Sequence, residues 1–302
     1  MSKFKYIATE EDNGQELRWI LRHRFKFSSR FRTKIKFGKL LCLNGVETPG
    51  WKKVKTGDLV SISLPDEKSD FPPENIPLDI CYEDDDLLII NKQFGVTVHP
   101  TRGCPCHTLA NGIMKHMIDN NQSYKIRFVN RLDTDTSGLL IVAKNSYTQN
   151  HITNQMRQKS VQKRYKALVL GNVSDDKFTI DLPIGRPDDG SIHRAVMPVG
   201  GSPSITHVTV LDRMTKDGQD YSLVDLRLET GRTHQIRVHL SHIGYPIVGD
   251  SLYGGDGSML INRQALHAYK LSFVHPVSEC PIEITAKLPD DIEQALKLIR
   301  NL

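Results

Sequence analysis

The chain has 302 residues, a formal net charge of +5, 38% hydrophobic residues and 25% charged residues. These values predict a soluble globular protein, and the length favours two domains over one hydrophobic core. No apolar run approaches the length of a membrane span, and residues 1–9 lack the apolar core of a signal peptide. The five cysteines are odd in number and scattered, which favours a reducing cytoplasm over a disulfide framework.

The positive charge is concentrated at the N-terminus. Residues 1–66 hold fourteen Lys and Arg against seven Asp and Glu, a balance of +7, so the remainder sums to −2. No acidic residue occurs between Leu17 and Val46. Such a run is typical of a protein that binds a nucleic-acid backbone, and the alternative is a solvated charged face. The candidate RNA-binding side chains are Arg30, Arg32, Lys34 and Lys36.

The elements expected at the N-terminus are helical structure and a hairpin. Residues 15–37 have helical spacing of apolar residues. Asn44-Gly45 lies between apolar stretches and predicts a hairpin, and Gly57-Asp58 predicts another turn. Helices followed by a small hairpin, with Leu-Asn-Gly and Gly-Asp at this spacing, resemble the S4 RNA-binding domain. We therefore expect a small S4-like RNA-binding domain over residues 1–66.

A proline-rich stretch separates this domain from the rest of the chain. Pro65, Pro72, Pro73 and Pro77 fall within thirteen residues, mixed with acidic residues. This composition predicts a linker over residues 67–79 and a larger domain over residues 80–302.

The larger domain is rich in expected strands. They cover residues 87–91, 138–143, 165–171, 205–211, 222–228, 270–274 and 282–287, and expected helices cover 107–119, 146–158, 233–242 and 290–300. Because strands and helices do not alternate regularly, we expect an α+β fold with a mixed or antiparallel sheet rather than a doubly wound one.

The most informative stretch is the segment 130–144. It sets Arg131 and Asp133 in a short polar loop that leads into the apolar run 139–143, which predicts a buried strand. A second acid, Asp135, suggests a two-carboxylate glycosidase. We expect Asp135 to bond nearby backbone amides in a turn. This leaves Asp133 as the candidate catalytic acid.

Two further segments are candidates for the same site. Tyr165 lies among Lys163, Arg164 and Lys166, which suits stacking on a base beside its phosphates. The alternative for this segment is an ordinary amphipathic strand. In the segment 228–240 a glycine ends a strand, Thr233 is placed to cap the next helix, and Arg232 is left at the corner.

Metal and cofactor sites are not favoured by the sequence. Asp84, Asp85 and Asp86 abut a strand at a spacing that does not fit an EF-hand, so a solvated turn is expected. His99, Cys104, Cys106 and His107 offer zinc ligands, but the Cys-Pro-Cys spacing is too tight. No His-x-Glu motif of a zinc deaminase and no glycine-rich phosphate loop occur. The spacing of His234, His239 and His242 does not place all three on one helix face, which favours a structural role.

Taken together, these segments resemble the RluA-type family of RNA pseudouridine synthases over essentially the whole chain. Among its members, the chain looks most similar to the bacterial enzymes that modify large-subunit ribosomal RNA. The segments that carry the resemblance are 83–92, 95–100, Arg131-Leu-Asp-x-x-Thr-Ser-Gly-Leu-Leu140, Lys163-x-Tyr165, Thr230-Gly-Arg-Thr-His-Gln-Ile-Arg-Val-His239, 249–254 and Leu266-His-Ala268. Two positions depart from the family: Asn130 stands where His is usual, and Gln93 where Pro is usual.

The resemblance implies a fold, an activity and a set of residue roles. The fold is a mixed, mainly antiparallel sheet with a central catalytic cleft, and the reaction turns uridine into pseudouridine. Asp133 acts at the ribose C1′ as nucleophile, Arg232 keeps it ionised, Arg131 fills the gap left by the extruded base, and Tyr165 stacks on the uracil and is a candidate base at C2′. The implied partner is RNA, either large-subunit ribosomal RNA or tRNA. No cofactor is needed, and a cytoplasmic monomer is expected.

Two other functions remain open from the sequence. One is a catalytically silent RNA-binding or ribosome-assembly factor, although a binder has no need for a desolvated acid facing anionic RNA. The other is a glycosidase that acts on a nucleoside. Analysis of the products distinguishes this glycosidase from a pseudouridine synthase, because only the glycosidase releases free base.

Overall fold

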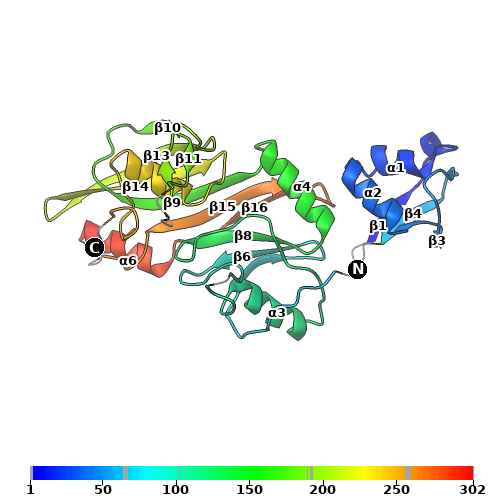
Figure 1. Ribbon diagram of the computed structural model, residues 1–302, viewed down its shortest axis with the longest axis horizontal. Coiled ribbons are helices and arrows are strands. Elements are labelled where there is room, and N and C mark those ends of the chain that lie inside the picture. Colours follow the sequence, from blue (N-terminus) through cyan, green and yellow to red (C-terminus); the bar gives the residue numbers. More distant parts are fainter. Residues whose placement is uncertain are drawn as a thin grey trace.

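The computed structural model describes residues 3–63, 67–101, 103–188, 190, 193–255 and 260–301. These residues form a four-stranded sheet at the N-terminus, a ten-stranded sheet in the rest of the chain and a small two-stranded pair (Figure 1). No helix within these ranges combines the length and the apolar character that crossing a membrane requires.

The N-terminal unit has its own hydrophobic core. Its sheet is antiparallel, in the order β1 (Lys3–Ile7), β4 (Leu59–Ser63), β2 (Leu41–Leu43) and β3 (Val46–Glu47). Two helices cover it, α1 (Leu17–His23) and α2 (Ser29–Phe37). Their apolar sides meet the sheet in a cluster that includes Leu17, Ile20, Ile35, Val60 and Ile62.

The expected hairpin is confirmed, and the stretch expected to be helical, residues 15–37, contains the two helices α1 and α2 with a break between them. Asn44 and Gly45 have φ values of 51° and 84°, which suit the tight turn between β2 and β3. The helix is interrupted because Phe27 turns into the core and the hydroxyl of Ser28 accepts a hydrogen bond from the backbone N–H of Phe31, which starts α2. Strand β1 was not expected from the sequence.

The proline-rich segment is extended but is not free of the larger unit. Glu67 pairs with Arg127 at 2.5 Å and with Lys34 of α2 at 3.3 Å. The hydroxyl of Ser69 accepts a hydrogen bond from the backbone of Ile126 at 2.9 Å, and the carbonyl of Pro72 accepts one from the side chain of Asn111 at 2.8 Å. The segment therefore lies along the surface of the larger unit.

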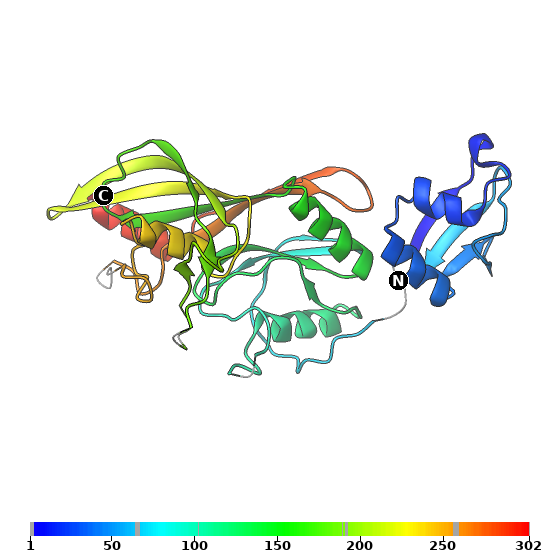
Figure 2. The ribbon, with the colours of Figure 1, turned by 45° about the horizontal axis from the view of Figure 1, so that its top comes forward.

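The N-terminal unit meets the larger unit at the start of α4 (Ser146–Arg157), as Figure 2 shows. The ring of Tyr147 packs against Phe4, Phe27 and Phe31 at centroid distances of 4.6, 5.1 and 5.5 Å. One aromatic side chain of the larger unit thus enters the edge of the N-terminal core.

The large sheet is mixed and mainly antiparallel, as expected. Its order is β10 (Lys177–Asp181), β13 (Ile205–Lys216), β14 (Gln219–Leu228), β9 (Gln162–Leu170), β15 (Leu266–Val274), β8 (Ser137–Ala143), β6 (Leu87–Lys92) and β5 (Asp79–Glu83). β7 (Arg127–Phe128) pairs with β8, and β16 (Pro281–Thr285) pairs with β15. β8 and β15 are parallel, and every other pair in this sheet among the described strands is antiparallel.

The remaining elements flank this sheet. They are α3 (Leu109–Asp119), α5 (Gln235–His242), α6 (Asp290–Arg300) and the short pair β11 (Ile184–Gly185) and β12 (Ala195–Val196). The starts and ends of α3 to α6 agree with the expected helices within two residues.

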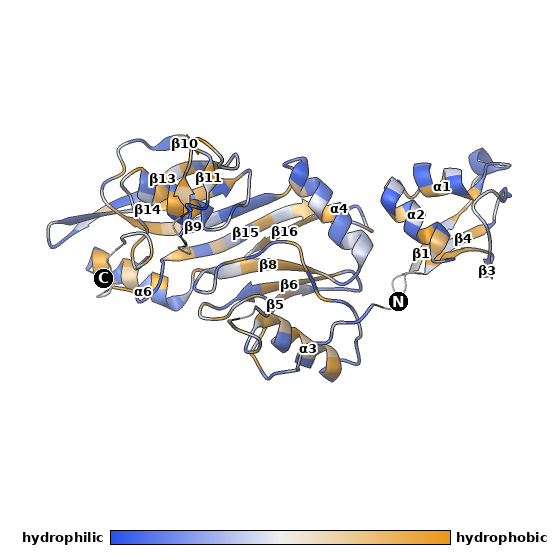
Figure 3. Ribbon diagram, viewed as in Figure 1, coloured by the Kyte–Doolittle hydropathy of each residue, from blue (hydrophilic) through white to orange (hydrophobic). Residues whose placement is uncertain are grey.

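The middle of the large sheet is buried on both faces. All seven residues of β8 are buried. Along it, Leu139 and Ile141 belong to one hydrophobic cluster and Leu140 and Val142 to the cluster on the opposite face. Figure 3 shows the hydrophobic colouring of this strand and of β6 beside it. This two-sided burial explains why the sequence of β8 is continuously apolar rather than alternating.

Gly138 is required where β8 passes β15. It has φ +119°, and a Cβ atom at this position would lie 2.3 Å from the carbonyl oxygen and 2.5 Å from the nitrogen of Ala268. Both the backbone conformation and the space therefore admit only glycine.

We expect Gly138→Ala to lower the free energy of unfolding by about 3 kcal/mol or more, because it combines backbone strain with overpacking against a neighbouring main chain. Urea unfolding followed by circular dichroism measures the loss. Gly103→Ala is the matched control, since a Cβ atom at Gly103 would meet no atom within 4 Å and its φ is not positive. Equal stability of the two variants would contradict the expectation.

Candidate active site

The loop before β8 carries the candidate catalytic acid and is held by buried cations. The backbone N–H of Thr136 donates to the carbonyl of Asp133 at 3.1 Å and closes a turn. The carbonyl of Thr134 accepts from Lys92 at 2.8 Å, and that of Asp135 accepts from Arg263 at 3.0 Å. The side chain of Asp133 is 27% exposed, so it is presented to solvent from a fixed backbone.

Lys92 is one of those cations and is fully buried. Its Nζ donates to the carbonyls of Gln93, Val96 and Thr134 at 2.9, 2.9 and 2.8 Å. Three donors exist only in the ammonium form, but burial opposes the charge and lowers the pKa of Lys92 to about 7. Because Gln93 takes part through its carbonyl, its departure from the usual proline leaves this contact in place.

Asn130, the other departure from the family, ties the same loop to β8. Its Oδ1 accepts from the backbone N–H of Ile141 at 2.8 Å, and its Nδ2 donates to the carbonyl of Leu139 at 3.3 Å. These bonds go to the backbone of the strand, so Asn130 acts on the placement of the loop.

Asp133 faces an arginine that is itself fixed by a second acid. Nη1 of Arg237, in the first turn of α5, lies 3.2 Å from Oδ2 of Asp133. The Nε and Nη2 atoms of the same guanidinium bond both oxygens of Asp250 at 2.7 and 2.8 Å. Burial works against the charge, but the hydrogen bonds and the negative charge of Asp250 raise the pKa of Arg237. A permanent positive charge is therefore held against the carboxylate of Asp133.

The resemblance assigned the position beside the Asp133 carboxylate to Arg232, but in the structure Arg237 occupies it. Arg232 is exposed, and its Nε donates to the carbonyl of Pro203 at 3.3 Å. The expected cap is also corrected: His234, not Thr233, is the N-cap of α5, and it makes no capping bond with its side chain. The helix thus begins later than expected, and its first inward-facing cation is Arg237. The signal in the sequence was an arginine between Ile236 and Val238 in this helix, together with the acid of Gly249-Asp250.

Arg131 and Tyr165 do lie at the Asp133 loop. The guanidinium of Arg131 is exposed and hydrogen-bonds the hydroxyl of Thr233, just before α5. Tyr165, on β9, is 7% exposed. Burial raises the pKa of Tyr165, and the charge of Asp133 adds to this effect. The structure therefore brings together the acid, a tyrosine and two arginines from three separate segments: the loop before β8, β9 and α5.

Asp135 does not act as expected. Its side chain is exposed and accepts no hydrogen bond from any residue that the structure describes; the turn is made by the backbone of Asp133 instead. The acidic stretch before β6 does form the expected turn, because Oδ1 of Asp84 accepts from the backbone N–H groups of Asp86 and Leu87 at 2.8 and 2.7 Å.

The four candidate RNA-binding cations differ in their surroundings. Arg32 donates to the carbonyl of Phe27 at 2.7 Å, and Lys34 contacts Glu67 and Ser146 at 3.3 Å each. Arg30 and Lys36 are exposed and form no ion pair within the described part of the chain. The latter two are therefore the members of the set that are open to a phosphate.

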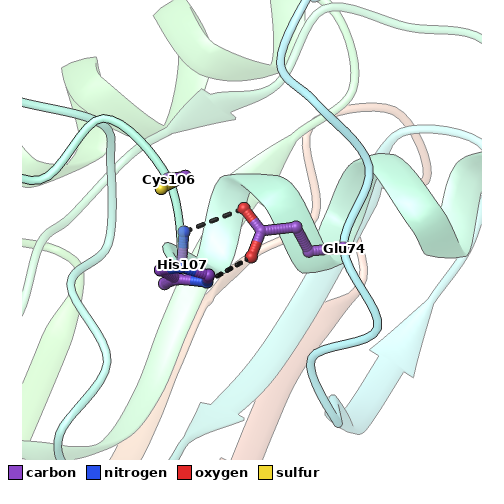
Figure 4. Close-up of side chains that lie close together, drawn as sticks. All are labelled: Glu74, Cys106 and His107. Carbon is purple, nitrogen blue, oxygen red and sulfur yellow. Dashed lines mark hydrogen bonds and ion pairs between the residues drawn. The ribbon is translucent and has the colours of Figure 1, made fainter.

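The four residues considered as zinc ligands, His99, Cys104, Cys106 and His107, do not form one group in the described part of the chain. Among the described residues one group of potential ligand atoms lies within 4.8 Å, and it joins Cys106 and His107 to Glu74 (Figure 4). Glu74 already binds the backbone N–H of His107 at 2.9 Å and its Nδ1 at 2.6 Å. These two contacts at the surface account for this arrangement, and the absence of a metal stays a prediction.

Comparison with known proteins gives the family. Residues 86–242 match the family model described as RNA pseudouridylate synthase, a range that contains Asp133, Tyr165 and Arg237. The chain belongs to this family. RNA pseudouridylate synthases are isomerases that act on RNA, which agrees with the resemblance described above.

Two relatives match over nearly their whole length. An uncharacterized RNA pseudouridine synthase of Bacillus subtilis, YlyB, is 39% identical over 100% of this chain and 99% of its own. The ribosomal large subunit pseudouridine synthase D of Escherichia coli is 35% identical over 99% of this chain and 95% of its own.

A solved structure supports the fold. Human RNA pseudouridylate synthase domain containing 1 has a TM-score of 0.58 and 29% identity, and covers 76% of this chain and 98% of its own.

We expect Lys92→Met to lower the free energy of unfolding by about 2 kcal/mol or more at neutral pH, since three buried carbonyls lose their donor. The difference should depend on pH. The pKa of Lys92 is about 7 in the folded chain and 10.5 ordinarily, so between these values the unfolded chain binds the extra proton and stability rises with pH. Urea unfolding of both proteins at pH 6, 7.5 and 9 checks this. A wild-type advantage that does not grow above pH 7 would contradict it.

Proposed function

We propose that this RNA pseudouridylate synthase isomerises specific uridines in structured RNA, with Asp133 as its nucleophile. The observation that carries the proposal is the Asp133 carboxylate on a rigid loop, 3.2 Å from the buried guanidinium of Arg237 and close to the buried ring of Tyr165. A binding protein gains nothing from an acid held in this way against an anionic ligand.

The reaction needs only side chains of this kind. The N1–C1′ bond breaks, the uracil turns, and a C5–C1′ bond forms while C5 loses a proton and N1 gains one. Atoms and electrons balance within the nucleotide, so no cofactor and no metal is required. The base must leave its stack to expose C1′, which requires groups that hold the extruded base and fill the gap.

The geometry supports distinct roles for the site residues. Both contacts of the Asp133 side chain with described residues reach Oδ2, from Arg237 and His234, so Oδ1 is available to C1′. We propose that Tyr165 stacks on the uracil and that Arg131, exposed on the loop of Asp133, fills the gap in the RNA. The raised pKa of the buried Tyr165 phenol disfavours the role of base at C2′. Arg232 is exposed beside the site and suits a contact with RNA, whereas Arg237 takes over the electrostatic role.

The RNA substrate is proposed from the relatives. The Escherichia coli relative is named for the large ribosomal subunit, and we infer large-subunit ribosomal RNA as the substrate, with tRNA as the alternative. We further propose that residues 1–66 form an S4-like RNA-binding domain, that residues 67–79 link it to the catalytic domain over 80–302, and that the enzyme is a cytoplasmic monomer. The separate core and the basic helix of the N-terminal unit support this division.

Asp133→Asn should reduce pseudouridine formation by about 1000-fold or more, because the amide has nearly the same shape but cannot act as the nucleophile. Nuclease digestion followed by liquid chromatography and mass spectrometry of ribosomal RNA transcripts measures the product. RNA affinity and urea stability should stay close to the wild type. Asp135→Asn is the comparison and should retain activity.

Three results would contradict this assignment. Substantial activity in Asp133→Asn would remove Asp133 from catalysis. A wild-type protein that binds RNA without forming pseudouridine would be a silent binding factor. Release of free uracil would indicate a nucleoside glycosidase.

The double variant Arg30→Gln/Lys36→Gln should weaken RNA binding and make it less sensitive to salt. Each lost phosphate contact should reduce the slope of log affinity against log salt by about 0.7 to 0.9. Filter binding between 50 and 300 mM KCl, roughly the range in which such slopes are resolved, measures this. The control Lys177→Gln/Lys297→Gln removes the same charge from β10 and α6, at the end of the molecule opposite α2 (Figure 1). If the slope of log affinity against log salt is the same for the two double variants, α2 is a solvated charged face and does not bind RNA.

A further inference from the structure

His234 lies in the site but has no part in the chemistry described so far. It connects β14 to α5 and has φ +56°, a left-handed conformation that is uncommon for residues other than glycine. Its side chain is 16% exposed, and its Nε2 lies 3.9 Å from Oδ2 of Asp133. The backbone therefore holds an imidazole in an unusual conformation with one nitrogen towards the catalytic acid.

The other nitrogen of this imidazole is fixed by a tyrosine. Nδ1 of His234 lies 2.8 Å from the hydroxyl oxygen of Tyr253, and the backbone N–H of Arg194 donates to the same oxygen at 2.9 Å. The ring of Tyr253 also lies 5.0 Å from the guanidinium carbon of Arg237. Tyr253 thus contacts both groups that face Oδ2 of Asp133.

These bonds determine which nitrogen of His234 carries the proton. If Nδ1–H of His234 donated to the hydroxyl oxygen of Tyr253, the phenol proton would have no acceptor among the described residues. The other group at that oxygen is the backbone N–H of Arg194, which is itself a donor. If the phenol donates to Nδ1, every group is satisfied. Nδ1 is therefore the acceptor, and the ring proton of neutral His234 is on Nε2, towards Asp133.

The charge state agrees with this assignment. Burial lowers the pKa of His234, Arg237 and Arg194 act in the same direction, and the charges of Asp133 and Asp250 oppose them. The neutral ring is thus the form present at pH 7. The distance of 3.9 Å is longer than a hydrogen bond, as is common for catalytic contacts before substrate binds.

We propose that His234, held by Tyr253 as the tautomer protonated on Nε2, is a positioning residue that donates to Oδ2 of Asp133 alongside Arg237 and so keeps Oδ1 turned towards C1′ of the uridine. This inference rests on the proposed role of Asp133. A carboxylate with a single partner can rotate about its Cβ–Cγ bond, whereas two donors on one oxygen fix its plane. Loss of such alignment lowers the rate of the chemical step rather than the binding of RNA.

The tautomer can be measured without any reference to activity. In protein labelled with ¹⁵N-histidine, long-range ¹H–¹⁵N correlations report which nitrogen of each ring is protonated; His234→Gln identifies the signals of His234. We expect a neutral ring with the proton on Nε2 in the wild type, and loss of this fixed pattern in Tyr253→Phe. A proton on Nδ1 in the wild type would overturn the proposal.

The effect on the reaction is measured with two side chains that differ only in reach. The amide nitrogen of His234→Gln extends to the place of Nε2, whereas that of His234→Asn ends near Nδ1. In single-turnover assays we expect Asn to lower the rate about 10- to 100-fold and Gln to recover most of it, with RNA affinity unchanged in both. Because Asn adopts the left-handed conformation more readily than Gln, backbone strain predicts the opposite order. His242→Gln, an exposed histidine on the same helix, is the control.

The outcomes separate this inference from the proposed function. If His234→Asn reacts as fast as the wild type, or if Asn is faster than Gln, the positioning role is wrong while the Asp133→Asn result stands. If the wild type forms no pseudouridine, the proposed function fails, and with it the positioning role, whatever tautomer the spectra show. If Asn is slow, Gln is faster and the ring proton is on Nε2, the proposal is supported.

Discussion

The parallel contact between β8 and β15 is the constraint on which the large unit depends. It joins an antiparallel block of β5, β6 and β8 to another that runs from β15 to β10. At this contact the register places Gly138 beside Ala268 and Ala268 beside Tyr165. These three residues, side by side across the sheet, set the distance between the Asp133 loop before β8 and the strand that carries Tyr165. Because Gly138 has no Cβ atom, the two main chains can approach closely enough for an acid on one block to face a ring on the other.

Around this contact, charged groups are buried in pairs or against carbonyls. Lys92 and Arg263 hold the backbone of the Asp133 loop, and Asp250 holds Arg237. Burying such charges costs free energy that only complete hydrogen bonding offsets, so these networks are a poor source of stability. Their effect is on geometry: the bonds of these cations fix the loop of Asp133 and place a guanidinium beside its carboxylate. The same logic extends to His234, whose proton is directed by a phenol outside the reaction centre.

The parts of the fold that the sequence predicted are those set by local pattern. The run Leu139–Ala143 is apolar because β8 is buried on both faces, and Asn44-Gly45 marks a tight turn because few other residues adopt its backbone angles. The parts that it did not predict depend on distant partners. Nothing near Phe27 shows that its ring turns into a core built from β1 and β4. The choice between Arg232 and Arg237 depends on where α5 starts and on Asp250, thirteen residues beyond Arg237. Asp133, Arg131 and Tyr165 could be named as candidates because their motifs are specific. His234 and Tyr253 could not, because what singles them out is the distance between their side chains.

The first strand of the chain pairs with the last strand of the N-terminal unit, residue Lys3 beside Ser63. The chain therefore enters and leaves this unit at neighbouring points of one sheet, and everything between them closes on its own core. A module with adjacent ends can be gained, lost or exchanged during evolution without moving the polypeptide on either side. With the RNA-binding role proposed for this module, its exchange would change the RNA that reaches the larger unit and leave the Asp133 site of that unit unchanged.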